Sequence, residues 1–164
     1  LHALPSHARA AAGVGWVPQE RNIFKSLTVH ENLTAVARPG AWTPARAYEM
    51  FPRLAERKGN LGTQLSGGEQ QMLAMGRALM CRPRMLLLDE PLAGMGAEET
   101  ERMLELLAQL RRDHAVLLVE HDMDAVFRIA DRITVMVNGT VIASDHPQAI
   151  RDNAEVQSAY LGGH

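Results

Sequence analysis

The chain has 164 residues, of which 46% are hydrophobic and 22% charged, and its formal net charge is −2 at pH 7. A chain of this size and composition can bury the core of one globular domain without disulfides or structural metals. The charge gives no basic face for nucleic acid, and the single cysteine, Cys81, excludes an internal disulfide and fits a reducing compartment.

No apolar run approaches the roughly 20 residues of a membrane-spanning helix, so if a membrane matters this protein works beside it. The first residues, Leu1 to Pro5, contain no basic stretch followed by an apolar segment, so a signal peptide is not expected. The sequence starts without Met, and we expect it to begin partway through a longer protein.

The first predicted element is a strand at Gly15–Val17, followed by Pro18 and Gln19. Proline restricts the residue before it to extended backbone, which is typical of a strand end. From residue 22 to residue 64, helix-favouring stretches are broken by proline and glycine at short intervals. This composition predicts a small helical region inserted after the first strand.

The segment Leu65-Ser66-Gly67-Gly68-Glu69 has the pattern of a helix start. Ser66 and Glu69 have the spacing of a capping box, so we expect a helix from Ser66 to about Cys81. First-turn amides carry the positive end of the helix dipole, and glycines let an anion approach them closely. The segment favours phosphate binding, although an ordinary capped helix after a glycine turn has the same pattern.

Met85–Leu88 is predicted as a buried strand, and Asp89 and Glu90 follow directly at its end. Open α/β sheets bind ligands at the carboxyl ends of their strands. Adjacent carboxylates on an extended backbone point to different sides, so the two acids can have different roles. Taken alone, Asp-Glu-Pro is more simply a solvated strand exit.

Short apolar runs and amphipathic stretches alternate over the rest of the chain. Glu98–Arg112 predicts a helix with five apolar residues on one face, and Ala115–Val119 predicts a second buried strand. Asn138-Gly139, between two apolar runs, predicts a hairpin because both turn positions favour positive φ. Short helices are expected at residues 122–130, 147–152 and 155–161. The alternation predicts an α/β fold with a mostly parallel sheet, crossover helices and a C-terminal β-hairpin.

His121 follows the second strand. Taken alone, Glu120-His121-Asp122 is compatible with a surface cluster or a weak metal site. No second His or Cys lies at helical or turn spacing from His121, which disfavours the metal.

The order of these motifs, Leu65-Ser66-Gly67-Gly68-Glu69 before a long helix and then an apolar strand ending in Asp89-Glu90, closely resembles the ATP-binding-cassette ATPase family. The resemblance implies part of a P-loop NTPase fold. It assigns residues 1–21 to the end of the first catalytic-core segment, residues 22–64 to a helical subdomain, and residues 65–164 to the remainder.

The resemblance also implies the site. Glu90 polarises the attacking water and His121 senses the γ-phosphate. Gln19 and Asp89 hold Mg²⁺, Asp89 through a water molecule. The segment Leu65–Glu69, which we call the signature segment, contacts ATP held by a second subunit. The ATP-binding residues are therefore expected to be Gln19, Leu65, Ser66, Gly67, Gly68, Glu69, Asp89 and His121.

Two features depart from the family pattern. Gly96 stands where many members have an aspartate, so a carboxylate contact across the dimer is not available there. The phosphate-binding Walker A loop, Gly-x-x-x-x-Gly-Lys-Ser/Thr, is absent, since the only lysines are Lys25 and Lys58 and neither has the required glycines before it. We expect the isolated chain to bind ATP poorly and to hydrolyse little.

Within the family, segments 21–24, 27–33, 66–74 and 156–162 resemble the ATPase subunits of branched-chain amino acid importers. Segments 90–95 and 120–123 resemble the partner ATPase of the same systems and of the related urea importers. This resemblance implies a second ATPase subunit (the same or a different chain), transmembrane permease subunits and, indirectly, a periplasmic or extracellular substrate-binding protein. It places the protein at the cytoplasmic face of the membrane, without nucleic acid.

Two alternatives share these motifs. One is a soluble cassette ATPase of DNA repair or translation, which salt-sensitive nucleic-acid binding would support. The other is a degenerate partner that only lends its signature segment to another subunit; Glu90 and His121 argue against it.

Overall fold

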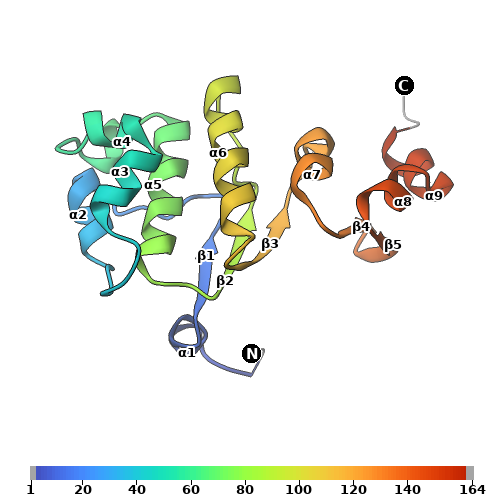
Figure 1. Ribbon diagram of the computed structural model, residues 1–164, viewed down its shortest axis with the longest axis horizontal. Helices are drawn as coiled ribbons and strands as arrows, with labels where there is room; N and C mark the ends of the chain where they lie inside the picture. The colour runs from blue at the N-terminus through green and yellow to red at the C-terminus, as the bar shows by residue number, and fades with distance from the viewer. Residues whose placement is uncertain (1–2, 162–164) are drawn as a thin grey trace. The chain divides into compact units, whose positions relative to one another are not determined.

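The computed structural model describes residues 3–161, which divide into two compact units, the first ending at Glu120 and the second beginning at His121 (Figure 1). The first unit contains a parallel three-stranded sheet in the order β1-β2-β3. Its strands are β1 (Val14–Val17), β2 (Met85–Asp89) and β3 (Ala115–Val119). The predicted parallel sheet is confirmed.

The two faces of this sheet differ in burial. Val17, Leu86 and Leu88 point to the covered face and are at most 1% exposed. Trp16, Leu87 and Leu117 are opposite one another in register on the other face, where Trp16 is 60% and Leu117 49% exposed.

The expectation that Ala115–Val119 is a buried strand is therefore wrong for its side chains. An apolar run in a parallel sheet indicates a strand covered on both faces. The described residues cover only one face of this sheet, so Val119 remains 52% exposed.

Three short helices follow β1: α2 (Val29–Thr34), α3 (Pro44–Met50) and α4 (Pro52–Glu56). A capping box between Thr28 and Glu31 starts α2, and proline occupies the first turn of α3 and α4, where its missing N–H costs nothing. All three helices contact α5 (Gly67–Met80), which a 3-10 turn at Gly62–Gln64 precedes.

The helix α5 is buried on nearly all sides rather than along one stripe. Besides its apolar residues, it buries Glu69 and Gln71, at 9% and 0% exposure. Buried polar groups of this kind need hydrogen-bond partners, so the side chains of Glu69 and Gln71 are expected to be bonded to neighbouring segments.

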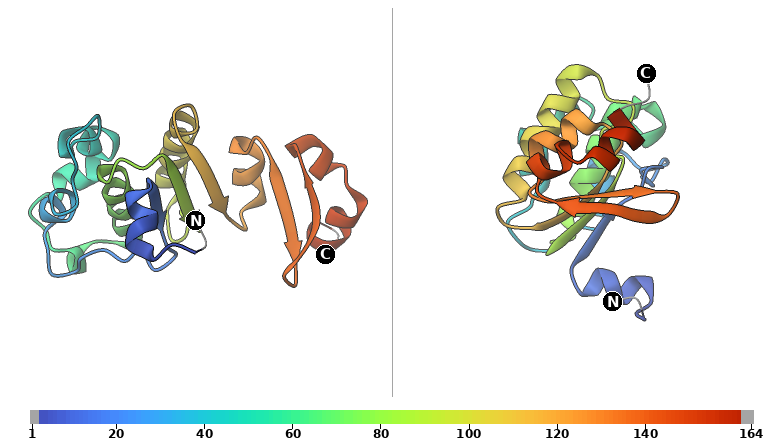
Figure 2. Two further views of the ribbon diagram at one scale, coloured as in Figure 1. Left: turned by 90° about the horizontal axis from the view of Figure 1, so that it is seen from below. Right: turned by 90° about the vertical axis from the view of Figure 1, so that its right-hand side faces the viewer.

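The helix α6 (Ala97–Leu110) lies along one face of the sheet (Figure 2). The five residues predicted for its apolar face are all buried: Met103, Leu104, Leu106, Leu107 and Leu110. The helix α1 (Ser6–Ala11) was not predicted, because its sequence has no apolar periodicity, and none of its residues is buried.

The second unit contains α7 (Met123–Ile129), the antiparallel hairpin of β4 (Ile133–Val137) and β5 (Thr140–Asp145), α8 (Pro147–Arg151) and α9 (Ala154–Val156) (Figure 2). A π-helical turn, Gln157–Leu161, follows. The hairpin turns at Asn138 and Gly139, which have φ of 48° and 79°, as predicted. Its core is formed by Ile133, Val135, Ile150 and Val156. Within residues 3–161, no helix is long and apolar enough to span a bilayer.

Candidate functional site

The start of α5 has the predicted capping box. Ser66 Oγ accepts a hydrogen bond from the Glu69 amide at 3.2 Å, and Glu69 Oε2 accepts one from the Ser66 amide at 2.8 Å. Arg57 Nε lies 3.6 Å from Glu69 Oε1 and holds this carboxylate from the other side. Leu65, 7% exposed, anchors the chain before the helix. These contacts fix the first turn of α5, and a helix start of this kind can bind an anion.

The glycines of this turn lie close to two charged side chains. A Cβ atom on Gly68 would overlap the carboxylate of Glu99, and one on Gly67 would lie 3.4 Å from Arg21 Nη2. Glu99 Oε2 in turn accepts a hydrogen bond from the Gly96 amide at 3.1 Å. The start of α6 thus packs directly against the start of α5.

The acidic pair lies at the carboxyl end of β2, next to the residues that follow β1. Gln19 Nε2 donates a hydrogen bond of 2.8 Å to Glu90 Oε2, although the two residues are 71 positions apart. Asp89 is half-buried and is the last residue of β2. The structure therefore brings Gln19, Asp89 and Glu90 to one edge of the sheet, where ligands of α/β proteins bind.

Glu90 does not continue the strand, contrary to the extended backbone expected for the acidic pair. Its φ is 46°, and the Ala93 amide donates back to the Glu90 carbonyl oxygen at 3.1 Å. The Glu90 amide is bonded to the Val119 carbonyl of β3 at 2.9 Å. A left-handed backbone at a non-glycine residue is uncommon and is kept only where the surroundings hold it.

Glu120, directly after β3, was given no role of its own in the sequence analysis. Its Oε1 accepts a hydrogen bond from the Leu92 amide at 3.0 Å. This contact fixes the loop that follows Glu90. No local pattern could reveal it, because the two residues are 28 positions apart.

Arg21 was also missed as a functional candidate. Arg21 Nε donates to Gln71 Oε1 at 3.2 Å, and Arg21 Nη2 donates to the Ala93 carbonyl oxygen at 3.3 Å. A second arginine, Arg77 of α5, donates to the Asn22 carbonyl oxygen at 2.7 Å and stacks 3.9 Å from the centre of the Phe24 ring. Burial lowers the pKa of the Arg77 guanidinium from its usual value.

His121 is the first residue of the second unit, and the next residue, Asp122, caps α7 by accepting from the Ala125 amide at 3.1 Å. The role of His121 in sensing phosphate remains a prediction. Among residues 3–161, no three His, Cys, Asp or Glu side chains gather as a metal site of their own.

The residues present fit a bound Mg²⁺ and nucleotide in kind. Mg²⁺ prefers oxygen ligands, keeps several of its waters and takes one or two carboxylates from the protein together with phosphate oxygens. Asp89 ends β2 and Gln19 follows the neighbouring parallel strand β1, so their side-chain oxygens lie at one sheet edge.

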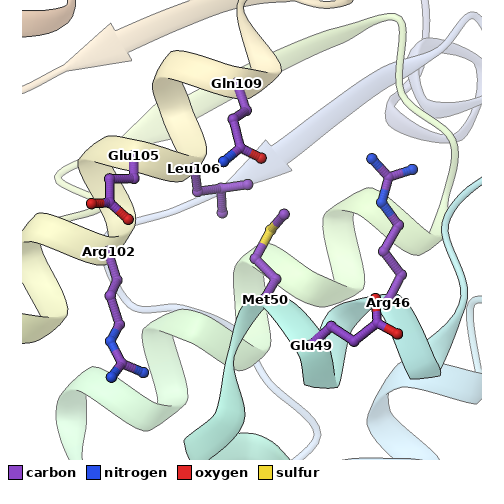
Figure 3. A pocket seen from close by; sticks show the side chains of 7 residues that line it. All are labelled: Arg46, Glu49, Met50, Arg102, Glu105, Leu106 and Gln109. Atoms are coloured by element: carbon purple, nitrogen blue, oxygen red, sulfur yellow. The ribbon is translucent and has the colours of Figure 1, made fainter.

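A separate cavity of about 320 Å³ lies between α3 and α6 (Figure 3). It contains none of the predicted site residues; its lining is Arg46, Glu49, Met50, Arg102, Glu105, Leu106 and Gln109.

Comparison with known proteins agrees with the motifs. A family model described as ABC transporter matches residues 2–93, and one described as branched-chain amino acid ATP-binding cassette transporter matches residues 140–164. The chain is 41% identical to the high-affinity branched-chain amino acid transport ATP-binding protein BraG of Pseudomonas aeruginosa, over 99% of this chain and 72% of BraG. It is 35% identical to the lipopolysaccharide export system ATP-binding protein LptB of Haemophilus influenzae, over 99% of this chain and 70% of LptB.

Among solved structures, a dimeric ATP-binding cassette in a post-hydrolysis state with ADP and phosphate superimposes with a TM-score of 0.76. The two chains are 25% identical, and the match covers 88% of this chain and 68% of that one.

The parallel sheet and the match to a solved ATP-binding cassette define the class of this protein as a member of the P-loop NTPase fold. The chain belongs to the ABC transporter family and is homologous to the ATP-binding subunits of branched-chain amino acid transport systems.

Proposed function

We propose that this chain forms most of the ATP-hydrolysing subunit of an importer for branched-chain amino acids. The observation that carries this proposal is the hydrogen bond between Gln19 and Glu90 at the sheet edge, in a chain 41% identical to BraG. Transport is driven by two such subunits that associate around ATP and separate after hydrolysis.

Ser66, Gly67 and Gly68 contact the γ-phosphate of ATP held by the second subunit. The capping box supports this role because it aligns the first-turn amides of α5 toward one anion site. Leu65 and Glu69 keep that turn in place through burial and the cap, and so act at the edge of the same ATP contact.

Glu90 positions and polarises the attacking water, which typically contributes about 10²–10⁴ in rate. Gln19, bonded to Glu90, lies where it can respond to the nucleotide beside this carboxylate. Bound Mg²⁺, held by Gln19 and through water by Asp89, neutralises charge on the phosphates. His121 contacts the γ-phosphate.

The permease subunits dock on the helical subdomain, residues 22–64, which joins the core segments 1–21 and 65–164. The exposed apolar residues Phe24 and Leu61, 42% and 39% exposed, support this surface. Hydrogen bonds from the Gly62 amide to Leu27 and from Thr63 to Lys25 join the segments that carry them. The subunit then lies at the cytoplasmic face of the membrane, and the substrate-binding protein acts on it only through the permease.

The similarity to LptB favours a second candidate, an export ATPase. The two candidates differ in the direction and identity of the transported molecule. They share the roles assigned to Glu90 and the signature segment.

The test is reconstitution of the complete subunit with the permease subunits that copurify with it, together with the cognate binding protein. Uptake of labelled leucine that requires ATP and is lost with Glu90→Gln is expected. ATP hydrolysis without uptake of any branched-chain amino acid would contradict the importer. Nucleic-acid-stimulated hydrolysis would instead favour a non-transport ATPase.

The 164-residue chain alone is expected to hydrolyse ATP at less than a hundredth of the rate of the complete subunit, because no Walker A lysine and glycines are present to hold the phosphates. Steady-state phosphate release measures this rate. Turnover by the 164-residue chain that Glu90→Gln abolishes would contradict the expectation.

A further inference from the structure

One guanidinium joins three segments that the sequence keeps far apart. Arg21 lies two positions after Gln19, and it donates to Gln71 of α5 at 3.2 Å and to the carbonyl oxygen of Ala93 at 3.3 Å. Gln71 is five positions after Ser66, and Ala93 is three positions after Glu90. Arg21 therefore contacts both α5, the helix that begins with the signature segment, and the loop that follows Asp89 and Glu90.

The guanidinium of Arg21 lies close to two glycines. A Cβ atom on Gly67 would lie 3.4 Å from Arg21 Nη2, and one on Gly94 would lie 3.2 Å from it. The guanidinium thus lies against the backbone of both glycines. Gly94 has a φ of 74°, the region where glycine is favoured, so a side chain at this position would be strained as well as close to Arg21.

The backbone at Arg21 is held as tightly as its side chain. Arg21 and Asn22 have φ of 66° and 48°, and the Arg21 amide donates to the Pro18 carbonyl oxygen at 2.9 Å. Consecutive left-handed residues that are not glycine persist only where the surroundings fix them. Arg77 fixes the same turn from α5 through the Asn22 carbonyl oxygen.

Loss of the hydrogen bond between Arg21 and Gln71 is expected to be destabilising, because Gln71 is buried. Its side chain is fully buried, and its Nε2 has no hydrogen-bond partner among the residues that the structure describes. The bond from Arg21 satisfies Gln71 Oε1, and without it the amide has lost a charge-assisted bond in a buried place.

From these contacts we infer that Arg21 is a positioning residue, a brace that keeps the signature turn and the Ala93–Gly94 loop in register with Gln19. A displacement of Gln19 by nucleotide is then passed to the surface offered to the second subunit. This inference rests on the proposed function. Arg21 acts through Gly67 and Ala93 and is not itself assigned a contact with ATP.

The structural effect of Arg21 is tested by amide hydrogen exchange of the complete subunit, measured with no nucleotide added. Arg21→Met keeps the length of the side chain and removes its donors. Amides in residues 66–72 and 91–96 are expected to exchange at least tenfold faster than in wild type. The control is Arg53→Met, since Arg53 is 62% exposed and pairs only locally with Glu56 at 3.1 Å. Equal exchange in Arg21→Met and Arg53→Met overturns the inference.

Kinetics test what the brace does. Arg21→Met is expected to lower kcat for ATP about tenfold with KM for ATP within twofold of wild type, because the brace aligns the signature turn and not the subunit's own nucleotide. Arg21→Lys keeps the charge but loses the forked donor pair, so its kcat is expected to lie between those of wild type and Arg21→Met. Wild-type kcat in Arg21→Met overturns the inference.

If Arg21→Met does not fold, Arg21→Lys decides by the same two measurements, and wild-type exchange and kcat in that variant overturn the inference. A wild-type subunit without Glu90-dependent hydrolysis contradicts the proposed function instead, and the exchange experiment then decides on the brace alone.

Discussion

At the scale of single residues, the hydrogen bond between Gln19 and Glu90 shows how the side chain of Glu90 is held. Glu90 Oε2 accepts the Gln19 amide at 2.8 Å, and the left-handed backbone of Glu90 is bonded to β3. Glu90 is therefore preorganised by groups from both neighbouring strands. In the proposed catalytic role of Glu90, a carboxylate held in this way reorganises less during the reaction.

The close approach of Gly68 and Glu99 gives a prediction about stability. Gly68→Ala is expected to displace the Glu99 carboxylate from the Gly96 amide and to lower the free energy of unfolding by no more than about 1 kcal/mol, because the overlapping atoms are the end of a flexible side chain. Urea unfolding of the complete subunit measures the loss. In the Glu99→Ala background the same change should cost nothing, since the overlapping group is gone.

Gly59→Ala is the matched control, because a Cβ atom at Gly59 meets nothing within 4 Å. A Gly68→Ala variant as stable as Gly59→Ala would contradict the prediction, because it would show that Glu99 of α6 can move away from Gly68 without lowering the free energy of unfolding.

At the scale of elements, the strands and helices that carry the site have strong local patterns. The buried run of β2, the capping box of α5, the apolar face of α6 and the Asn138-Gly139 turn could all be predicted from the sequence. Each depends on residues close together in the chain, for which periodicity and turn chemistry are informative.

Other features could not be predicted, because they depend on contacts distant in sequence. The exposure of Leu117 follows from which face of the sheet is covered, and the turn of Glu90 follows from its bond to β3. Arg21 and Glu120 gain their roles only when α5 and the loop after β2 come together in space. The roles of the predicted site residues remain proposals that rest on family resemblance and this geometry.

The turn of the hairpin between β4 and β5, Asn138-Gly139, leads to a prediction about stability. Gly139→Ala is expected to lower stability by about 1–2 kcal/mol, because φ at this position is 79° and a Cβ atom is strained there. Asn138→Gly should leave stability within about 0.5 kcal/mol, since glycine also adopts its φ of 48°. Thermal unfolding of both variants tests the pair; equal losses would contradict the turn assignment.

At the scale of the whole molecule, the chain has a capped, glycine-containing helix start and an acidic sheet edge within one unit. The solved cassette most relevant to this arrangement is a dimer bound to ADP and phosphate, and the chain matches 68% of it. In the proposed mechanism these two surfaces serve different ATP molecules, so function requires a second subunit.

The most direct test is the mass of the complete subunit carrying Glu90→Gln, measured by light scattering with and without Mg²⁺ and ATP. Blocked hydrolysis should trap the closed pair, so the mass is predicted to double only when ATP is present. Adding Gly67→Asp, whose carboxylate suits a helix start but repels phosphate, should keep the protein monomeric. A mass that ATP does not change, or a doubling that survives Gly67→Asp, would contradict the account.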